Sequence, residues 1–173
     1  MLHESDKVNE LIIKENTTTF DDIYLKDYFP KELSADIKKA NLLILPYENF
    51  RDFDKPIFPE ETMNFFHFVR EKGDSSLITD ICISDEEYSE LELHADLIIV
   101  PMMIVSSFIV PVAVNVVSDY INSKRESRNK NEDLKVKVTF TVVENDSSKT
   151  FEYEGDADKF AETFEQVKDY FDK

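Results

Sequence analysis

The chain has 173 residues, of which 42% are hydrophobic, so it is long and apolar enough to bury a core. Its net charge of −17 at pH 7 disfavours nucleic acid as a partner, because the phosphates would be repelled. Only two glycines and one cysteine are present, which excludes glycine-rich phosphate-binding loops and an internal disulfide.

Residues 1–40 form a polar segment that we expect to contain short helices. The best candidate is the stretch PKELSADIKKA, because its Pro30 suits the start of a helix. The beginning of the sequence lacks the basic region and the long apolar region of a signal peptide. We therefore expect a cytoplasmic location.

Residues 41–125 are predicted to form an α/β core. Three short apolar runs, ANLLILPY, LITDICI and ADLIIVPM, are typical of buried strands. Between them, PEETMNFFHFVREKG predicts a helix that stops at Gly73. In SDEEYSELELH, Ser84 and Glu87 have capping-box spacing, which predicts a second, short helix. This alternation favours a small parallel-type sheet with flanking helices.

The stretch 97–118 contains no charged residue, and two interpretations fit it. It is long enough to be a single span of the inner membrane. Alternatively, Pro101 ends a strand and a helix runs from Phe108 to Lys124, with Pro111 in its first turn. The second interpretation explains a polar stripe at helical spacing, formed by Asn115, Ser118, Asp119 and Asn122. We predict strand plus helix across 97–124 and keep the span as the alternative.

Residues 134–173 are predicted to form a ββα unit, so that the α/β fold becomes α+β at this end. LKVKVTFTV alternates strictly, KTFEYE returns after the turn ENDSS, and an amphipathic helix begins near Asp156. The helix places six apolar residues on one face: Ala157, Phe160, Ala161, Phe164, Val167 and Phe171. We expect this face to pack on the apolar face of the hairpin.

Candidate chemistry is sparse. His3, His67 and His94 lie in separate segments without a second ligand nearby, so no metal site and no other cofactor is predicted. In an open sheet, sites gather where strands end. Glu48 and Asp85 follow two predicted strands and could form a catalytic carboxylate pair, or could serve only in turns and caps.

The layout of the second part of the chain resembles that of a known group of proteins. From about Ala95 onward, an apolar segment is followed by a charged linker, the hairpin VKVTFTVVENDSSKTFEYEG and a closing helix. This order is similar to that of the effector-associated constant components, small accessory proteins of bacterial conflict and antiphage systems. The resemblance implies a non-catalytic role in coupling or tethering an effector, and it assigns no site residues.

These observations favour a non-enzymatic accessory protein that binds another protein in a bacterial defence system. The acidic chain would suit a partner with a basic surface. One alternative is a membrane-tethered component with its span at 97–118. The other alternative is a small α/β enzyme that uses Glu48 and Asp85. The oligomeric state does not follow from the sequence.

Overall fold

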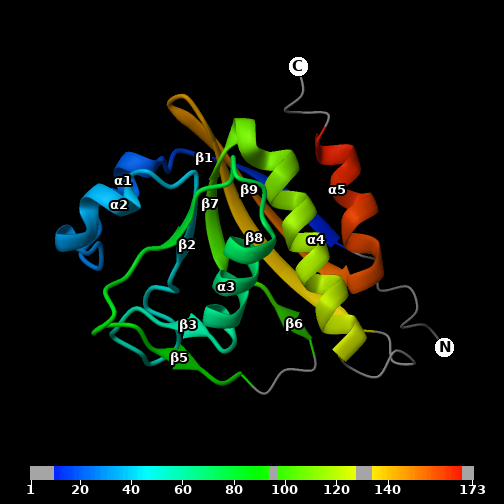
Figure 1. Ribbon diagram of the computed structural model, residues 1–173, viewed down its shortest axis with the longest axis horizontal. Helices are drawn as coiled ribbons and strands as arrows, with labels where there is room; N and C mark the ends of the chain where they lie inside the picture. The colour runs from blue at the N-terminus through cyan, green and yellow to red at the C-terminus, as the bar shows by residue number, and fades with distance from the viewer. Residues whose placement is uncertain (1–9, 94–96, 128–133, 169–173) are drawn as a thin grey trace.

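The computed structural model describes residues 10–93, 97–127 and 134–168. Its main element is a mixed β-sheet with helices, in the strand order β1-β9-β8-β7-β2-β4 (Figure 1). The strands are β1 (Glu10–Asn16), β2 (Leu42–Leu45), β4 (Thr79–Ile81), β7 (Met102–Ser106), β8 (Lys135–Glu144) and β9 (Ser147–Asp156). A short strand β6 (Ile98–Ile99) also pairs with β8, and β3 (Phe58–Pro59) pairs separately with β5 (Glu90–Leu91).

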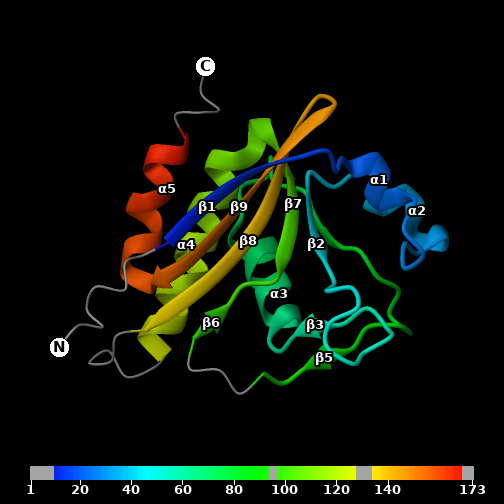
Figure 2. The same cartoon turned by 180° about the vertical axis from the view of Figure 1, so that it is seen from behind.

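The helices lie mainly on one face of the sheet. They are α1 (Phe20–Tyr24), α2 (Ser34–Ile37), α3 (Thr62–Lys72), α4 (Val110–Ser127) and α5 (Phe160–Lys168), with 3-10 turns at Lys31–Leu33, Ser107–Ile109 and Ala157–Lys159. Helices α3, α4 and α5 lie in front of the sheet in Figure 1. Seen from behind in Figure 2, β1, β9 and β8 have no helix over them, whereas α1 and α2 lie beside the β2 end.

The α/β fold class is confirmed, but the sheet is not of the parallel type that the alternation of strands and helices predicted. β2 pairs in parallel with β4 and β7 in parallel with β8, whereas β2 runs antiparallel to β7 and β9 runs antiparallel to both β8 and β1. The apolar run of β2 reflects burial of all four of its residues, from Leu42 to Leu45. A central strand covered on both faces is apolar whatever the direction of its neighbours, so composition could not reveal the pairing.

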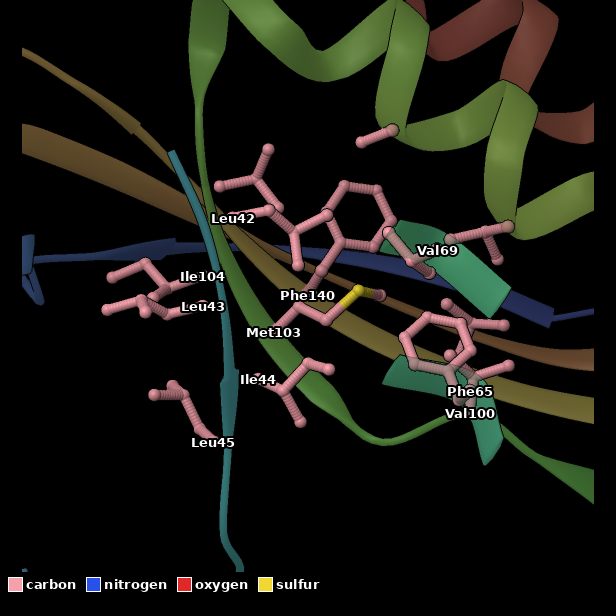
Figure 3. Packing of buried hydrophobic residues seen from close by; sticks show 14 of the residues in the cluster. Leu42, Leu43, Ile44, Leu45, Phe65, Val69, Val100, Met103, Ile104 and Phe140 are labelled. Atoms are coloured by element: carbon pink, nitrogen blue, oxygen red, sulfur yellow. The ribbon is translucent and has the colours of Figure 1, made fainter. Parts of the chain in front are cut away.

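The core is continuous across the sheet. In Figure 3, Leu42 and Ile44 point to the side of α3 and α4, while Leu43 and Leu45 point to the opposite side. The first pair shares its side with Phe65 of α3 and Phe140 of β8, both buried. Apolar residues of α1 and α2, Ile23 and Ile37 among them, belong to the same buried cluster.

The uncharged stretch 97–118 is divided between strand and helix, as predicted, but two strands replace the single strand that was expected. β6 is followed by Pro101, β7 and a 3-10 turn, and α4 then begins at Val110 with Pro111 in its first turn. On α4, Asn115, Asp119 and Asn122 are exposed and Ser118 is half-buried, whereas Val116 is buried. Among the helices of the described residues, none is both long and apolar enough to cross a membrane.

The ββα arrangement is also confirmed. The alternate residues Val136, Val138, Phe140 and Val142 of β8 are all buried. Phe160 and Phe164 of α5 are buried as well, and the ring centroids of Phe140 and Phe164 lie 5.2 Å apart. The predicted contributions of Phe171 and of the Val167 side chain lie outside the described residues.

Two local predictions were wrong. Part of the segment predicted as helical, Glu10–Asn16, forms strand β1 instead. This strand pairs with β9, which lies near the other end of the described sequence. Residues 84–91 form a turn and strand β5 instead of a helix. Ser84 does accept a hydrogen bond from the Glu87 N–H at 3.3 Å, as a cap would. The chain then extends, because Tyr88 stacks on Phe58 with the ring centroids 5.0 Å apart.

Candidate acidic binding site

The candidate site begins at the end of β2, where the sequence predicted a functional carboxylate. Pro46 follows β2, and Tyr47 then exchanges backbone hydrogen bonds of 2.7 and 3.1 Å with Ile57. These bonds close the base of the loop that carries Glu48 and Asn49. Asn49 has a φ of 52°, a left-handed conformation that asparagine tolerates better than most residues.

Three chain segments surround a hollow of about 340 Å³ next to this loop. We call it the acidic hollow. Its walls come from the segment after α1, the loop after β2 and the turn after β4, and its lining residues are Asp27, Tyr28, Glu48, Asn49, Asp54, Pro56 and Glu87. Four carboxylates therefore line one concave surface.

The predicted pair of Glu48 and Asp85 is placed differently by the fold. Glu48 lines the acidic hollow, but Asp85 is an exposed residue of the turn after β4 and is not part of the lining. Its neighbour Glu87 takes that place, because the Glu87 and Tyr88 N–H groups both bond to the Ser84 carbonyl and turn the chain. The hollow thus brings Glu48 together with Glu87.

Lys26 forms an ion pair with a carboxylate of the hollow. The Lys26 ammonium is 3.1 Å from a carboxylate oxygen of Glu48, and both side chains are partly exposed. An exposed ion pair of this kind contributes ~0–1 kcal/mol, because water competes for both groups. Lys26 can therefore be displaced from Glu48 by another cation at a small cost.

Tyr28 gives the hollow a buried wall. Only 6% of this residue is exposed, although it lines the hollow. Burial raises the pKa of Tyr28 well above its usual value, and nearby Cys82 and Glu48 add to the effect. The hydroxyl therefore stays protonated at neutral pH.

The chemistry of these groups suits recognition of a cation. Carboxylates accept charge-assisted hydrogen bonds, and a tyrosine hydroxyl can accept a further one. In the described ranges, no group of three or more His, Cys, Asp or Glu residues lies close enough to hold a metal ion. The four carboxylates are thus distributed around the hollow, an arrangement that fits an extended polyatomic cation such as a guanidinium or an ammonium group on a chain.

The other polar residues singled out in the sequence lie elsewhere. His67 is exposed on α3, where its ring lies against Phe66 with the centroids 5.8 Å apart. His3 and His94 are outside the described residues. Cys82 is fully buried, and burial raises its thiol pKa to about 12.

Several residues of the hollow were not predicted. Asp27 and Tyr28 belong to a segment that the sequence marked only as polar, and nothing in its spacing indicates that it lies beside the β2 loop. Asp54 lies in the loop after Glu48, which also contains Asp52, and this acidic composition is the one signal in the sequence that could have added Asp54 to the site. Glu87 was assigned to a helix cap, and the turn that actually forms there directs it to the hollow.

Comparison with known proteins gave no match to a family model, to a curated protein or to a solved structure. The similarity in layout to the effector-associated constant components therefore stays a prediction.

Proposed function

We propose that this chain is a binding protein, without catalytic activity of its own, that accepts a basic side chain of a partner protein in the acidic hollow. One observation carries the proposal: Asp27, Glu48, Asp54 and Glu87, from three separate segments, line the same hollow. Its volume of about 340 Å³ falls within the range of ligand-binding clefts, which are commonly ~300–1,000 Å³.

The arrangement supports an arginine or lysine side chain as the group that is bound. Carboxylates on several sides of the hollow can accept several N–H bonds at once, as a guanidinium requires. Tyr28 also lines the hollow, and a tyrosine hydroxyl can accept a further hydrogen bond. The overall charge of −17 would also attract a basic partner over longer distances.

Membership in a bacterial defence system and a cytoplasmic location are part of the same proposal. The first rests on the layout of residues 95–173 and the second on the N-terminal composition. Neither is needed for binding of a basic side chain at the acidic hollow.

The proposal can be tested with a matched pair of short peptides. One contains a single arginine and the other has citrulline at that position, which keeps the shape and removes the charge. In an NMR titration of the full chain, we expect the arginine peptide to cause saturable shifts at Tyr28, Asn49 and Glu87. The citrulline peptide should cause none, because it cannot make charge-assisted bonds.

Variants then locate the binding site. Glu48→Gln combined with Glu87→Gln should weaken binding about tenfold or more, since each lost bond to a charged group is worth ~1.5–3 kcal/mol. Glu152→Gln combined with Glu154→Gln removes two charges from strand β9 instead; this control should bind normally. Lys26→Ala should bind more tightly, because it frees Glu48. Equal responses to both peptides, or equal losses in the control and in the variant of the hollow, would contradict the proposal.

A further inference from the structure

Strand β1 forms one edge of the sheet. It pairs with β9 along Glu10–Asn16, and no strand of the described chain pairs with its other side (Figure 2). Unpaired edges of this length are places where another strand can add, unless the sequence prevents it. The residues of β1 therefore decide what this edge can accept.

The hydrogen-bond pattern of the hairpin identifies the free backbone groups. Ala157 donates its N–H to the Leu134 carbonyl at 2.8 Å, just beyond the last pair of the β8–β9 ladder. Hydrogen-bonded and non-hydrogen-bonded pairs alternate along an antiparallel ladder. If the pairs are counted back from Ala157 along β9, Glu154 and Glu152 are in non-hydrogen-bonded pairs with β8. Their N–H and C=O groups therefore point towards β1.

The same alternation applies to β1. Glu10 and Ile12 are opposite Glu154 and Glu152, so their backbone groups bond to β9. The N–H and C=O groups of Leu11, Ile13 and Glu15 therefore point to the free edge. A second strand must match its own free groups to these, which restricts the possible registers.

Charge and apolar character select one of these registers. We propose that β1 pairs antiparallel with β1 of a second copy of this chain, with a two-fold axis at Ile12, so that the two sheets become continuous. In this register Glu10 is opposite Lys14 of the second copy, Leu11 is opposite its Ile13, and Ile12 is opposite its Ile12. Across residues 10–14, each charged residue then faces the opposite charge, and each apolar residue faces another apolar residue.

The neighbouring symmetric registers are poorer. An axis at Ile13 places Leu11 opposite Glu15 and Ile12 opposite Lys14. An axis at Lys14 places two lysines opposite one another, which is destabilising. Of these three registers, only the axis at Ile12 pairs residues 10–14 with complementary residues.

Two features of the single chain agree with this partner. Glu10 is directly opposite Glu154 within the sheet, an unfavourable placement that Lys14 of a second copy would offset. Ile13 is 42% exposed at the edge, and Leu11 is half-buried there. A second β1 would cover both apolar side chains.

Sedimentation equilibrium of the full chain at ~0.15 M salt, where the repulsion between the acidic chains is largely screened, should show a dimer. Glu10→Lys should weaken dimerisation at least tenfold, because it places two cations opposite each other. Glu10→Lys should not lower the melting temperature of the monomer, since it also removes the repulsion between Glu10 and Glu154. Glu10→Lys with Lys14→Glu should restore the dimer. A wild-type monomer, or a dimer insensitive to Glu10→Lys, would overturn the proposal.

Cysteine crosslinking tests the register. The Ile12→Cys variant should form an intermolecular disulfide on mild oxidation, since residues opposite each other in a non-hydrogen-bonded pair have Cα atoms ~4.5 Å apart. The Ile13→Cys variant should not, because its two cysteines would be separated along the strands. Crosslinking at position 13 but not at position 12 would overturn the proposed register. The native Cys82 is buried and does not interfere.

Discussion

The rings of Phe140 on β8 and Phe164 on α5 lie 5.2 Å apart, and both are shielded from solvent. We expect Phe164→Ala to lower the free energy of unfolding by ~3–5 kcal/mol, because it removes apolar contacts and leaves a cavity. Lys137→Ala, on the exposed face of β8, is the control and should change it by less than ~0.5 kcal/mol. Urea unfolding measures both values, and similar losses would mean that the open face of the sheet is also covered.

Adjacent residues of α4 should respond oppositely to substitution. Val116 is 3% exposed, and Val116→Asp would place a carboxylate in the core at a cost of several kcal/mol. Asn115 is exposed, so Asn115→Leu should alter stability by no more than ~0.5 kcal/mol. Thermal unfolding of the two variants checks this, and a severe loss in Asn115→Leu would contradict the orientation of α4.

Glu90 acts as a cap for a helix that is distant in sequence. Its carboxylate accepts hydrogen bonds from the N–H of Glu61 at 3.0 Å and of Met63 at 3.3 Å, at the start of α3. We expect Glu90→Ala to destabilise the protein by ~1 kcal/mol, as loss of an N-terminal cap generally does. Glu86→Ala, an exposed acidic residue of the preceding turn, should have almost no effect in the same unfolding experiment. Equal effects would show that the cap contributes nothing beyond its charge.

Burial of Cys82 should make stability fall at alkaline pH. Its thiol pKa is raised to about 12 in the fold from an ordinary value of 9.0. The unfolded chain therefore loses this proton first, and the contribution to stability is complete below pH 9 and decreases from pH 9 towards pH 12. The slope for one group is at most about 1.4 kcal/mol per pH unit.

Denaturation across this pH range should show that Cys82→Ala delays the alkaline decline. Some decline should remain, because burial also raises the pKa of Tyr153 to about 12 from 10.0. At pH 8 the folded wild-type protein should react with a thiol reagent only as fast as it unfolds. Rapid labelling under native conditions would contradict the burial of Cys82.

Patterns that depend on neighbouring residues were predicted well. Val136, Val138 and Phe140 alternate along β8 because one face of that strand is buried. The polar stripe of α4 likewise indicated a helix packed on one side. In both cases the spacing of the apolar residues along the sequence matches the repeat of the strand or helix, so the buried side can be read from the sequence.

Features that depend on distant contacts could not be predicted. The capping-box pattern at Ser84 was overridden by the stacking of Tyr88 on Phe58 and by the bonds from Glu90 to α3. Glu48 was identified because it follows a strand, but Asp27 joined it only through the three-dimensional fold. β2 and β7 are separated in the chain by α3 and four short strands. Their direction of pairing depends on the path of this whole segment, which side-chain periodicity does not encode.

The pairing of β1 with β9 also has a consequence for synthesis of the protein. Glu10 pairs with Glu154, so β1 leaves the ribosome long before its partner strand β9 has been made. At ~5–20 residues per second, this wait is several seconds to about half a minute. During that time the backbone N–H and C=O groups on both edges of β1 have no partner strand. The β1–β9 ladder, which joins the residues farthest apart in sequence within the sheet, has not yet formed. A nascent chain would therefore be most vulnerable to mispairing with other chains through β1, until translation has passed Asp156.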